Sequence, residues 1–412
     1  MRKIKSTILV ALIVFALIPT TISMIPTASA ATPAYTEVNG TLNGANYTIR
    51  FPSPLTNWNR VLVVYCHGYS ATEPTRPLIK ATDGTESWSN GTLSIGSAFA
   101  ISSFGTGGWA IQKGMNATHE LAQFIVSTYK VAKVYLVGVS MGGAVALLLA
   151  EKYPRVYSGV MDISGSKNLT ERYNRMKDWG ATTNDTELAA KIQAVGGKVP
   201  PFPITLIAPT ANLSTQLQTF RTLCNRYVID IAAETGGTPE NASQGYQKVD
   251  PLYHANISIP VISVHGTADA FTPYPSALQY QTAVAAAGKS SLFRLYTVAG
   301  AEHADLAVQA EASRHMLELA ALSRELRPLL QASAFCDVTL LPGWTWWFFA
   351  QSTGNVGTCT YQWYEGTTML QGQTSMIMPV TKNAAGNYTF YCQVSDADGV
   401  TINTNTVTLT IM

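Results

Sequence analysis

The chain has 412 residues, which is enough for more than one domain. Its 27 lysines and arginines nearly balance its 25 aspartates and glutamates, so the formal net charge is only +2. The basic residues form no cluster, and the sequence therefore predicts neither a nucleic-acid-binding surface nor a contact with an anionic membrane.

The first 30 residues have the pattern of a secretory signal peptide. A basic segment at 2–5, with two lysines and an arginine, precedes a short apolar core at 8–18. Ala28-Ser29-Ala30 supplies a cleavage site of small residues. We expect cleavage, with a mature chain that begins near Ala31. The alternative is an uncleaved N-terminal anchor, because apolar residues continue through Ile25. Both interpretations predict a secreted or cell-surface protein.

Sequons for N-glycosylation support export, because they are spread along the whole chain and are typical of a host that glycosylates its surface proteins. The ten sequons begin at Asn39, Asn46, Asn90, Asn116, Asn168, Asn184, Asn212, Asn241, Asn256 and Asn387. We therefore expect a glycoprotein.

The five cysteines, Cys66, Cys224, Cys336, Cys359 and Cys392, are an odd number, so at least one has no partner within the chain. Their spacing has no zinc-binding pattern, and we expect neither a metal nor a cofactor. Cys66 ends an expected strand, where a small apolar thiol packs more often than it reacts.

Strands and helices alternate between residues 46 and 165. An apolar strand at 61–64 leads into Tyr65-Cys66-His67-Gly68-Tyr69, and a further strand at 134–137 follows an intervening helix. Alternation of this kind indicates a mostly parallel sheet with helices on both faces.

Gly138-Val139-Ser140-Met141-Gly142 lies between the strand at 134–137 and a helical segment at 144–151. A G-x-S-x-G motif in this setting is typical of a nucleophile elbow, a tight turn that exposes the serine Oγ at the top of the sheet. The N-terminus of the following helix supplies partial positive charge where an oxyanion forms. The motif predicts that Ser140 is a catalytic nucleophile.

A serine nucleophile needs a base and a carboxylate that orients the base. Asp269 follows an expected strand at 259–266, and His303 follows another at 291–298. Catalytic groups of open α/β sheets gather beyond the carboxyl ends of the strands. We therefore expect Ser140, Asp269 and His303 to form a triad.

The other candidates are weaker. Asp162 ends an expected strand at 159–163 and is the alternative acid, but it is embedded between Met161 and Ile163. His119 and His315 fall in helical patterns, His254 lies in a loop, and His265 is expected to pack under the Asp269 loop.

Residues 47–319 resemble the α/β-hydrolase superfamily, because these motifs occur in the family's order, serine, acid, histidine. Within it, Asn57-Trp58-Asn59, His67-Gly68-Tyr69 and Gly107-Gly108-Trp109-Ala110 resemble a group of secreted microbial hydrolases. The resemblance implies an oxyanion hole made by the backbone N–H groups of Tyr69 and Met141. It implies a mechanism more closely than a substrate.

A region of different character separates the two halves of the sheet. Residues 166–258 contain helical patches at 186–195 and 214–235 and a proline-rich segment at 199–203. An insertion at this point of the fold implies a cap over the active site.

Near residue 330 a helical pattern at 310–329 gives way to alternation typical of short strands, at 344–349, 359–364, 386–392 and 405–411. This predicts a small all-β sandwich over 334–412. It resembles immunoglobulin-like modules of microbial, especially archaeal, surface proteins, which carry signals similar to those at 361–364, 385–388 and 404–410. The alternation allows a Cys359–Cys392 bridge and leaves the cysteine pairing open.

The sequence thus predicts an α/β-hydrolase domain over 35–330, with a cap inserted at about 166–258, followed by an immunoglobulin-like β-sandwich. The expected function is an exported serine hydrolase that cleaves carboxylic esters, with a small-molecule or polymer ester as substrate. The C-terminal module is expected to contact the cell surface or a polymer. Two alternatives stay open: a serine peptidase of the same fold, and a catalytically inert surface-binding or adhesion protein.

Overall fold

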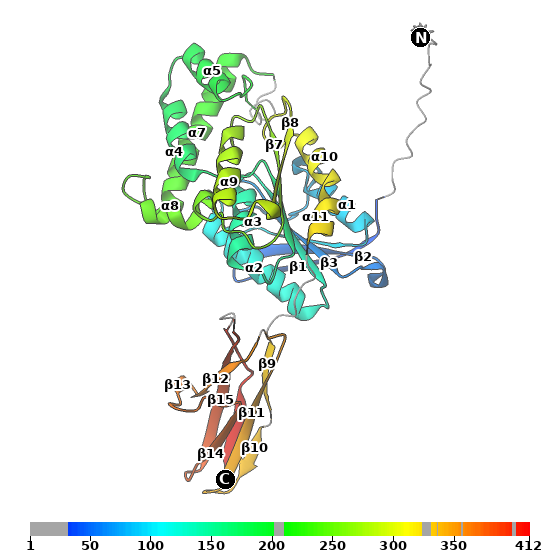
Figure 1. Cartoon of the computed structure of the whole chain (residues 1–412), viewed down its shortest axis with the longest axis vertical. Coiled ribbons are helices and arrows are strands. Elements are labelled where there is room, and N and C mark those ends of the chain that lie inside the picture. Colours follow the sequence, from blue (N-terminus) through cyan, green and yellow to red (C-terminus); the bar gives the residue numbers. More distant parts are fainter. Residues whose placement is uncertain (1–31, 202–209, 324–330, 336, 356, 398–400) are drawn as a thin grey trace, which may run out of the picture.

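Figure 1 shows the computed structural model, which describes residues 32–201, 210–323, 331–335, 337–355, 357–397 and 401–412. The expected signal peptide lies outside the described residues, as does part of the proline-rich segment. Within the described part of the chain, no helix has both the length and the apolar character needed to cross a bilayer.

One eight-stranded sheet forms the centre of the larger region, with the strand order β1-β2-β4-β3-β5-β6-β7-β8. Strands β1, β2 and β4 pair antiparallel, and every pairing from β4 to β8 is parallel. The strands are β1 (Tyr35–Leu42), β2 (Ala45–Pro52), β3 (Val61–Cys66), β4 (Ala98–Ser102), β5 (Lys133–Val139), β6 (Gly159–Ile163), β7 (Val261–Gly266) and β8 (Phe293–Val298).

Helices cover both faces of this sheet (Figure 1). Alternate residues of β3 show the two layers, because Leu62 and Val64 pack in one apolar cluster and Val63 and Tyr65 in the other. The first cluster includes side chains of α2 (Ile111–Thr128), α3 (Met141–Lys152) and α9 (Tyr274–Ala286); the second includes those of α1 (Thr85–Ser94), α10 (Leu306–Arg314) and α11 (Met316–Leu322). The predicted α/β-hydrolase fold class is confirmed.

Between β6 and β7 the described residues form four further α-helices, α4 (Leu169–Ala181), α5 (Asp185–Ala194), α7 (Leu213–Thr235) and α8 (Ser243–Val249). Figure 1 shows them at one end of the sheet, where α4 lies along α7. We call this group of helices the cap. Short 3-10 helices lie at Leu55–Asn57, Ala81–Asp83 and Ser290–Leu292, and another, Pro251–Tyr253, lies between α8 and β7.

Three of the sequon asparagines begin helices of the cap. The side chains of Asn168, Asn184 and Asn212 accept hydrogen bonds from the backbone N–H groups of Glu171, Glu187 and Thr215. Asparagine is among the best N-cap residues, and such a cap contributes about 1 kcal/mol. These three positions therefore have a structural role that does not depend on glycosylation.

The C-terminal region consists of two small sheets, with the strand orders β10-β17-β15-β12-β13 and β14-β11-β9, and β16 pairs with β15. Phe348, Trp363 and Phe390 are buried between them. The strands are β9 (Gln331–Phe335), β10 (Val338–Leu340), β11 (Thr345–Thr353), β12 (Thr360–Glu365), β13 (Thr368–Met369), β14 (Ile377–Thr381), β15 (Gly386–Ser395), β16 (Thr401–Asn403) and β17 (Val407–Ile411). This all-β arrangement fits an immunoglobulin-like module.

The Cys359–Cys392 bridge that the alternation allowed is not formed, because both residues are free thiols. Strands β12 and β15 are neighbours in one sheet, and Cys392 lies opposite Trp363 rather than Cys359. Cys359 lies four positions before Trp363, which corresponds to roughly 13 Å of extended chain. A disulfide requires Cα atoms within about 7 Å of each other.

Candidate active site

Ser140 occupies the turn between β5 and α3, in a backbone conformation that few non-glycine residues adopt, with φ 58° and ψ −118°. A Cβ atom on Gly142 would overlap the carbonyl group of Cys66, and one on Gly138 would overlap that of Gly142. The two glycines of the motif are therefore required for the close approach of strand and helix around the serine.

The structure brings the three expected triad side chains together. His303 Nε2 lies 2.9 Å from Ser140 Oγ, and His303 Nδ1 lies 2.8 Å from Asp269 Oδ2. An ionised carboxylate only accepts hydrogen bonds, so we assign the imidazole proton to Nδ1. Nε2 is then free to accept the hydroxyl proton of Ser140, which is the geometry of a general base.

The Asp269 carboxylate is completely buried and is held by its own turn. Its Oδ1 accepts hydrogen bonds from the backbone N–H groups of Phe271 at 2.9 Å and Thr272 at 2.8 Å, and the Thr272 hydroxyl lies 2.7 Å from Oδ2. Burial alone would raise the pKa of Asp269. The charge and hydrogen bond of His303 outweigh burial and, with smaller help from His265 and Thr272, hold this pKa well below its usual range.

The alternative acid, Asp162, does not reach the histidine. Its Oδ2 lies 2.6 Å from Lys167 Nζ, and both side chains are completely buried. The same oxygen accepts a hydrogen bond from Ser263 Oγ at 2.8 Å. Asp162 is thus part of a buried ion pair next to the site rather than the partner of His303.

His265 lies under the Asp269 loop, as the sequence predicted. It is completely buried, its Nε2–H donates to the Thr272 carbonyl, and Nε2 lies 3.5 Å from Asp269 Oδ2. Burial, followed by the charge of Lys167, lowers the pKa of His265 to about 4, so its ring is neutral at pH 7. The sequence did not reveal that Thr272 bonds to Asp269 or that Lys167 pairs with Asp162. The contact of Thr272 could have been expected, because it follows Asp269 by three residues in a turn. No sequence pattern indicated the contact of Lys167.

Three further histidines make hydrogen bonds to groups outside the triad. His119 bonds to the Tyr157 hydroxyl at 3.2 Å, His254 to the Gln247 carbonyl at 2.7 Å, and His315 to two carboxylates of its own helices. Burial raises the pKa of the Cys66 thiol to about 12, which makes this cysteine a packing residue.

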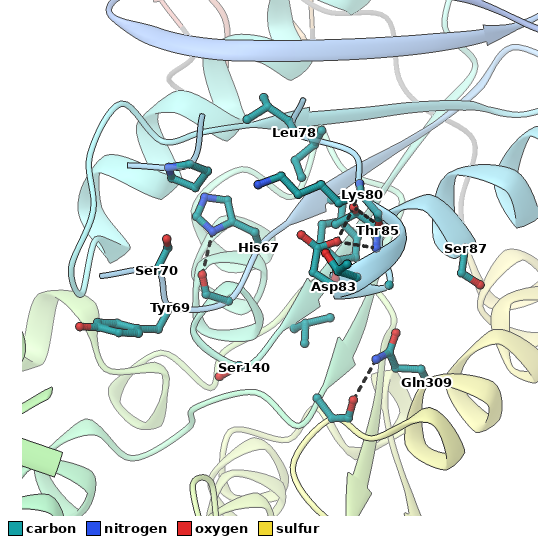
Figure 2. Close-up of a pocket in the computed structure, with 18 of the residues that line it drawn as sticks. His67, Tyr69, Ser70, Leu78, Lys80, Asp83, Thr85, Ser87, Ser140 and Gln309 are labelled. Carbon is teal, nitrogen blue, oxygen red and sulfur yellow. Dashed lines mark hydrogen bonds between the residues drawn. The ribbon is translucent and has the colours of Figure 1, made fainter. Parts of the chain in front are cut away.

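Ser140 and His303 line a cavity of about 1040 Å³. Figure 2 shows Ser140 among the side chains around it. In this view His67 and Tyr69 lie on one side of the cavity and Lys80 and Asp83 on the other. The cavity continues to the N-terminus of α10, where Gln309 lines it. A substrate placed in this space would have direct access to the Ser140 hydroxyl.

Of the two residues expected at the oxyanion hole, Met141 directly follows Ser140 in the chain, and Tyr69 belongs to a loop that the fold brings to Ser140. Met141 begins α3, and Tyr69 follows β3. A Cβ atom on Gly68 would lie 3.4 Å from Ser140 Cβ and 3.9 Å from its Oγ, so the backbone before Tyr69 passes directly against Ser140. The donor role of the two backbone N–H groups stays a prediction.

Residues 105–217 match the family model described as "Putative esterase", and this stretch contains Ser140 and its elbow. This family match and the eight-stranded sheet together support a hydrolase with the α/β-hydrolase fold. No curated protein matches the chain.

Among solved structures, an esterase of Pyrococcus furiosus is 14% identical, with a TM-score of 0.46, over 70% of this chain and 91% of that one. Est1E from Butyrivibrio proteoclasticus is 15% identical, with a TM-score of 0.41, over 69% and 99%. An acylaminoacyl peptidase of Pyrococcus horikoshii is 11% identical, with a TM-score of 0.45, over 73% of this chain and 42% of that one.

Proposed function

We propose that this protein is an exported serine hydrolase that cleaves carboxylic esters. The observation that carries the proposal is the continuous hydrogen-bonded series from Asp269 through His303 to Ser140, which ends at the wall of a large cavity. A nucleophile, a base and an orienting carboxylate within hydrogen-bond reach are the signature of covalent acyl transfer.

In the proposed reaction, Ser140 Oγ attacks the ester carbonyl carbon while its proton moves to His303 Nε2. The backbone N–H groups of Tyr69 and Met141 stabilise the negative carbonyl oxygen of the tetrahedral intermediate. The alcohol leaves with the proton from His303, and an acyl group stays on Ser140. Water then loses a proton to His303, attacks the acyl carbon, and releases the carboxylic acid as Ser140 regains its proton.

The family match over residues 105–217 favours esters over amides as substrates. The experiment uses a fluorophosphonate probe together with two substrate series, short p-nitrophenyl esters and aminoacyl p-nitroanilides. We expect probe labelling that is absent in Ser140→Ala, and turnover of the esters only. Faster turnover of the anilides would favour the peptidase, and a wild-type chain that resists the probe would favour the inert binding protein.

Export is part of the same proposal, supported by the signal-peptide pattern of residues 1–30. Mass spectrometry of the protein recovered from the culture medium or cell envelope should give an N-terminus near residue 31. An intact N-terminus in a membrane fraction would favour the uncleaved anchor.

For the C-terminal module we propose binding to an uncharged polysaccharide, through a surface that we call the aromatic face. Trp347 and Phe349 of β11 are 51% and 46% exposed, and the register places Phe349 between Phe335 and Ile377, which are 45% and 38% exposed. The described outward-facing positions of this sheet carry no charge, and threonine, serine and glutamine flank the rings.

The size and chemistry of the aromatic face favour a sugar chain. Four half-exposed side chains offer about 400 Å², which is below the roughly 800 Å² per partner of a standard protein interface. Sugar rings present C–H groups that pack on aromatic faces, and their hydroxyls can bond to the flanking side chains.

Binding of the full chain to insoluble cellulose and chitin should be lost in a Trp347→Ala/Phe349→Ala variant. It should persist in Met369→Ala, which removes an equally exposed side chain, 51% accessible, from the other sheet. Failure of the wild type to bind either polymer, or dimerisation that the double variant abolishes, would contradict this role.

A further inference from the structure

We infer that the cap positions the oxyanion hole through the side chain of Tyr69, an inference that rests on the proposed esterase function. The Tyr69 hydroxyl donates a hydrogen bond of 2.6 Å to Asp230 Oδ2. Tyr69 belongs to the loop after β3, which passes against Ser140, whereas Asp230 belongs to α7 of the cap. This contact joins two segments that are 161 residues apart in the chain.

Asp230 is a fixed acceptor for this bond. Arg226, one turn earlier on α7, directs its Nε toward both carboxylate oxygens at 2.9 Å, and Asp230 is only 7% exposed. Gly108 lies directly beside it, since a Cβ atom there would be 3.5 Å from Asp230 Cγ. Burial, followed by the hydrogen bond and charge of Asp230, raises the pKa of Tyr69, so the phenol keeps the proton that it donates.

The ring of Tyr69 is held by the same helix. It meets the ring of Tyr227 edge to face, with 4.4 Å between the ring centroids and an interplanar angle of 86°. Edge-to-face pairs of aromatic rings add about 1 kcal/mol beyond their buried area. Because the hydroxyl and the ring both contact α7, the side chain of Tyr69 has little freedom to rotate.

The other end of the catalytic site contacts the cap as well. Arg172 of α4 places its guanidinium 4.7 Å from the ring centroid of Trp109 and 5.2 Å from that of Tyr227. Its NH1 group donates to the carbonyl of Phe271 at 2.8 Å, two residues after Asp269. The cap therefore contacts the loop of the acid and the loop of the expected oxyanion donor at the same time.

Tyr69 has two separable parts in this arrangement. Its backbone N–H is the proposed donor to the oxyanion, and its side chain orients that peptide group through Asp230. Removal of one whole oxyanion donor lowers kcat by about 10²–10³. Loss of the orientation alone should have a smaller effect, about 10–50-fold, on kcat. KM should change little, because the oxyanion charge exists only after the attack.

The test compares Tyr69→Phe, Asp230→Asn and the double variant, with turnover of p-nitrophenyl butyrate and inhibition by an alkyl boronic acid that forms a tetrahedral adduct with serine. We expect each variant to lower kcat and weaken the boronic acid by a similar factor, with KM within threefold. The double variant should be no worse than either single one, because both changes remove the same bond. Ile229→Ala is the matched control, since Ile229 neighbours Asp230 on α7 but is 63% exposed.

Three results separate the possibilities. Wild-type kcat in Tyr69→Phe, with an active wild-type enzyme, overturns the inference and leaves the esterase function intact. A rise in KM alone, with unchanged kcat and boronic acid affinity, also overturns it, because Tyr69 would then only line the substrate cavity. If wild type and Ser140→Ala are equally inactive on esters, the proposed function itself fails. Tyr69→Phe keeps the ring and tests the inference even if Asp230→Asn does not fold.

Discussion

Asp162 and Asp269 are two completely buried carboxylates associated with neighbouring strands, β6 and β7, yet their surroundings differ. Asp162 lies within its strand and pairs with Lys167, whereas Asp269 lies on a turn beyond its strand and pairs with His303. Position near the carboxyl end of a parallel strand is therefore not sufficient to bring a carboxylate to His303. The carboxylate must also leave the strand far enough to meet the base.

The two carboxylates also differ in what stabilises their charge. Backbone N–H groups of its own turn hold one oxygen of Asp269, and the other faces His303. Asp162 depends on a lysine ammonium that has been removed from water, and its Oδ1 has no hydrogen-bond partner among the described residues. We expect Asp269 to govern activity and Asp162 to govern stability, and the following experiments test this division from the largest expected effect to the smallest.

Ser140→Ala defines the residual activity with which the variants of the two carboxylates are compared. Removal of a triad nucleophile lowers kcat by about 10⁵–10⁶, because no acyl-enzyme can form. Turnover of p-nitrophenyl butyrate by the purified variant checks this value, with circular dichroism as the control for folding. Retention of a tenth of the wild-type activity would show that Ser140 is not the nucleophile.

Asp269→Asn should lower kcat by about 10⁴, because an amide no longer selects the Nδ1–H tautomer of His303 or stabilises the imidazolium. Steady-state kinetics at pH 7 to 8 measures the loss. The Asn side chain keeps the shape of the acid, so the melting temperature should change far less than activity does. A loss below tenfold would remove Asp269 from the proposed triad.

Asp162→Asn should leave kcat within tenfold of wild type but lower the free energy of unfolding by about 3–5 kcal/mol, because Lys167 is left buried without its counter-charge. Urea unfolding measures this change. The double variant Asp162→Asn/Lys167→Met is the control and should recover part of the stability. A loss of activity near 10⁴ with unchanged stability would reverse the roles of the two carboxylates.

His265, whose charged form is disfavoured by complete burial and by the charge of Lys167, should make stability depend on pH. Its pKa is lowered to about 4 in the folded chain, so the unfolded chain binds more protons between roughly pH 6.5 and 4. Its contribution is present above that range and is lost as the pH falls through it, by about 3 kcal/mol in all.

Urea unfolding at pH 7 and pH 4.5 checks this contribution, with His265→Gln as the comparison. The difference between the two pH values should be smaller in the variant than in wild type, because glutamine does not titrate. An equal difference in both proteins would mean that other groups carry the acid sensitivity.

Local sequence patterns predicted the parts of the site that depend on neighbouring residues. The elbow at Ser140 needs only a strand, two glycines and a helix, all within one short segment. Asp269 and His303 could be predicted because each follows directly after a strand of the same parallel sheet. The expected cap helices at 186–195 and 214–235 correspond to α5 and α7 for the same reason, since amphipathic spacing is a local property.

The features that the sequence failed to predict, or predicted wrongly, depend on residues distant in the chain. Strand β4 was not predicted, because it is only five residues long; it is a strand because it pairs with β2 on one side and β3 on the other. The Cys359–Cys392 bridge failed because alternation shows which face a residue occupies but not which residue of the next strand lies opposite.

The sequence by itself determined the fold class, the strand–turn–helix elbow at Ser140 and a short list of candidate acids and bases, because each of these depends on residues a few positions apart. The tertiary structure alone decided that Lys167 pairs with Asp162 and leaves Asp269 to His303. It alone brought Asp230 of the cap to the hydroxyl of Tyr69. Contacts of this kind join segments that become neighbours only when helices pack on the sheet, and no local pattern of residues specifies them.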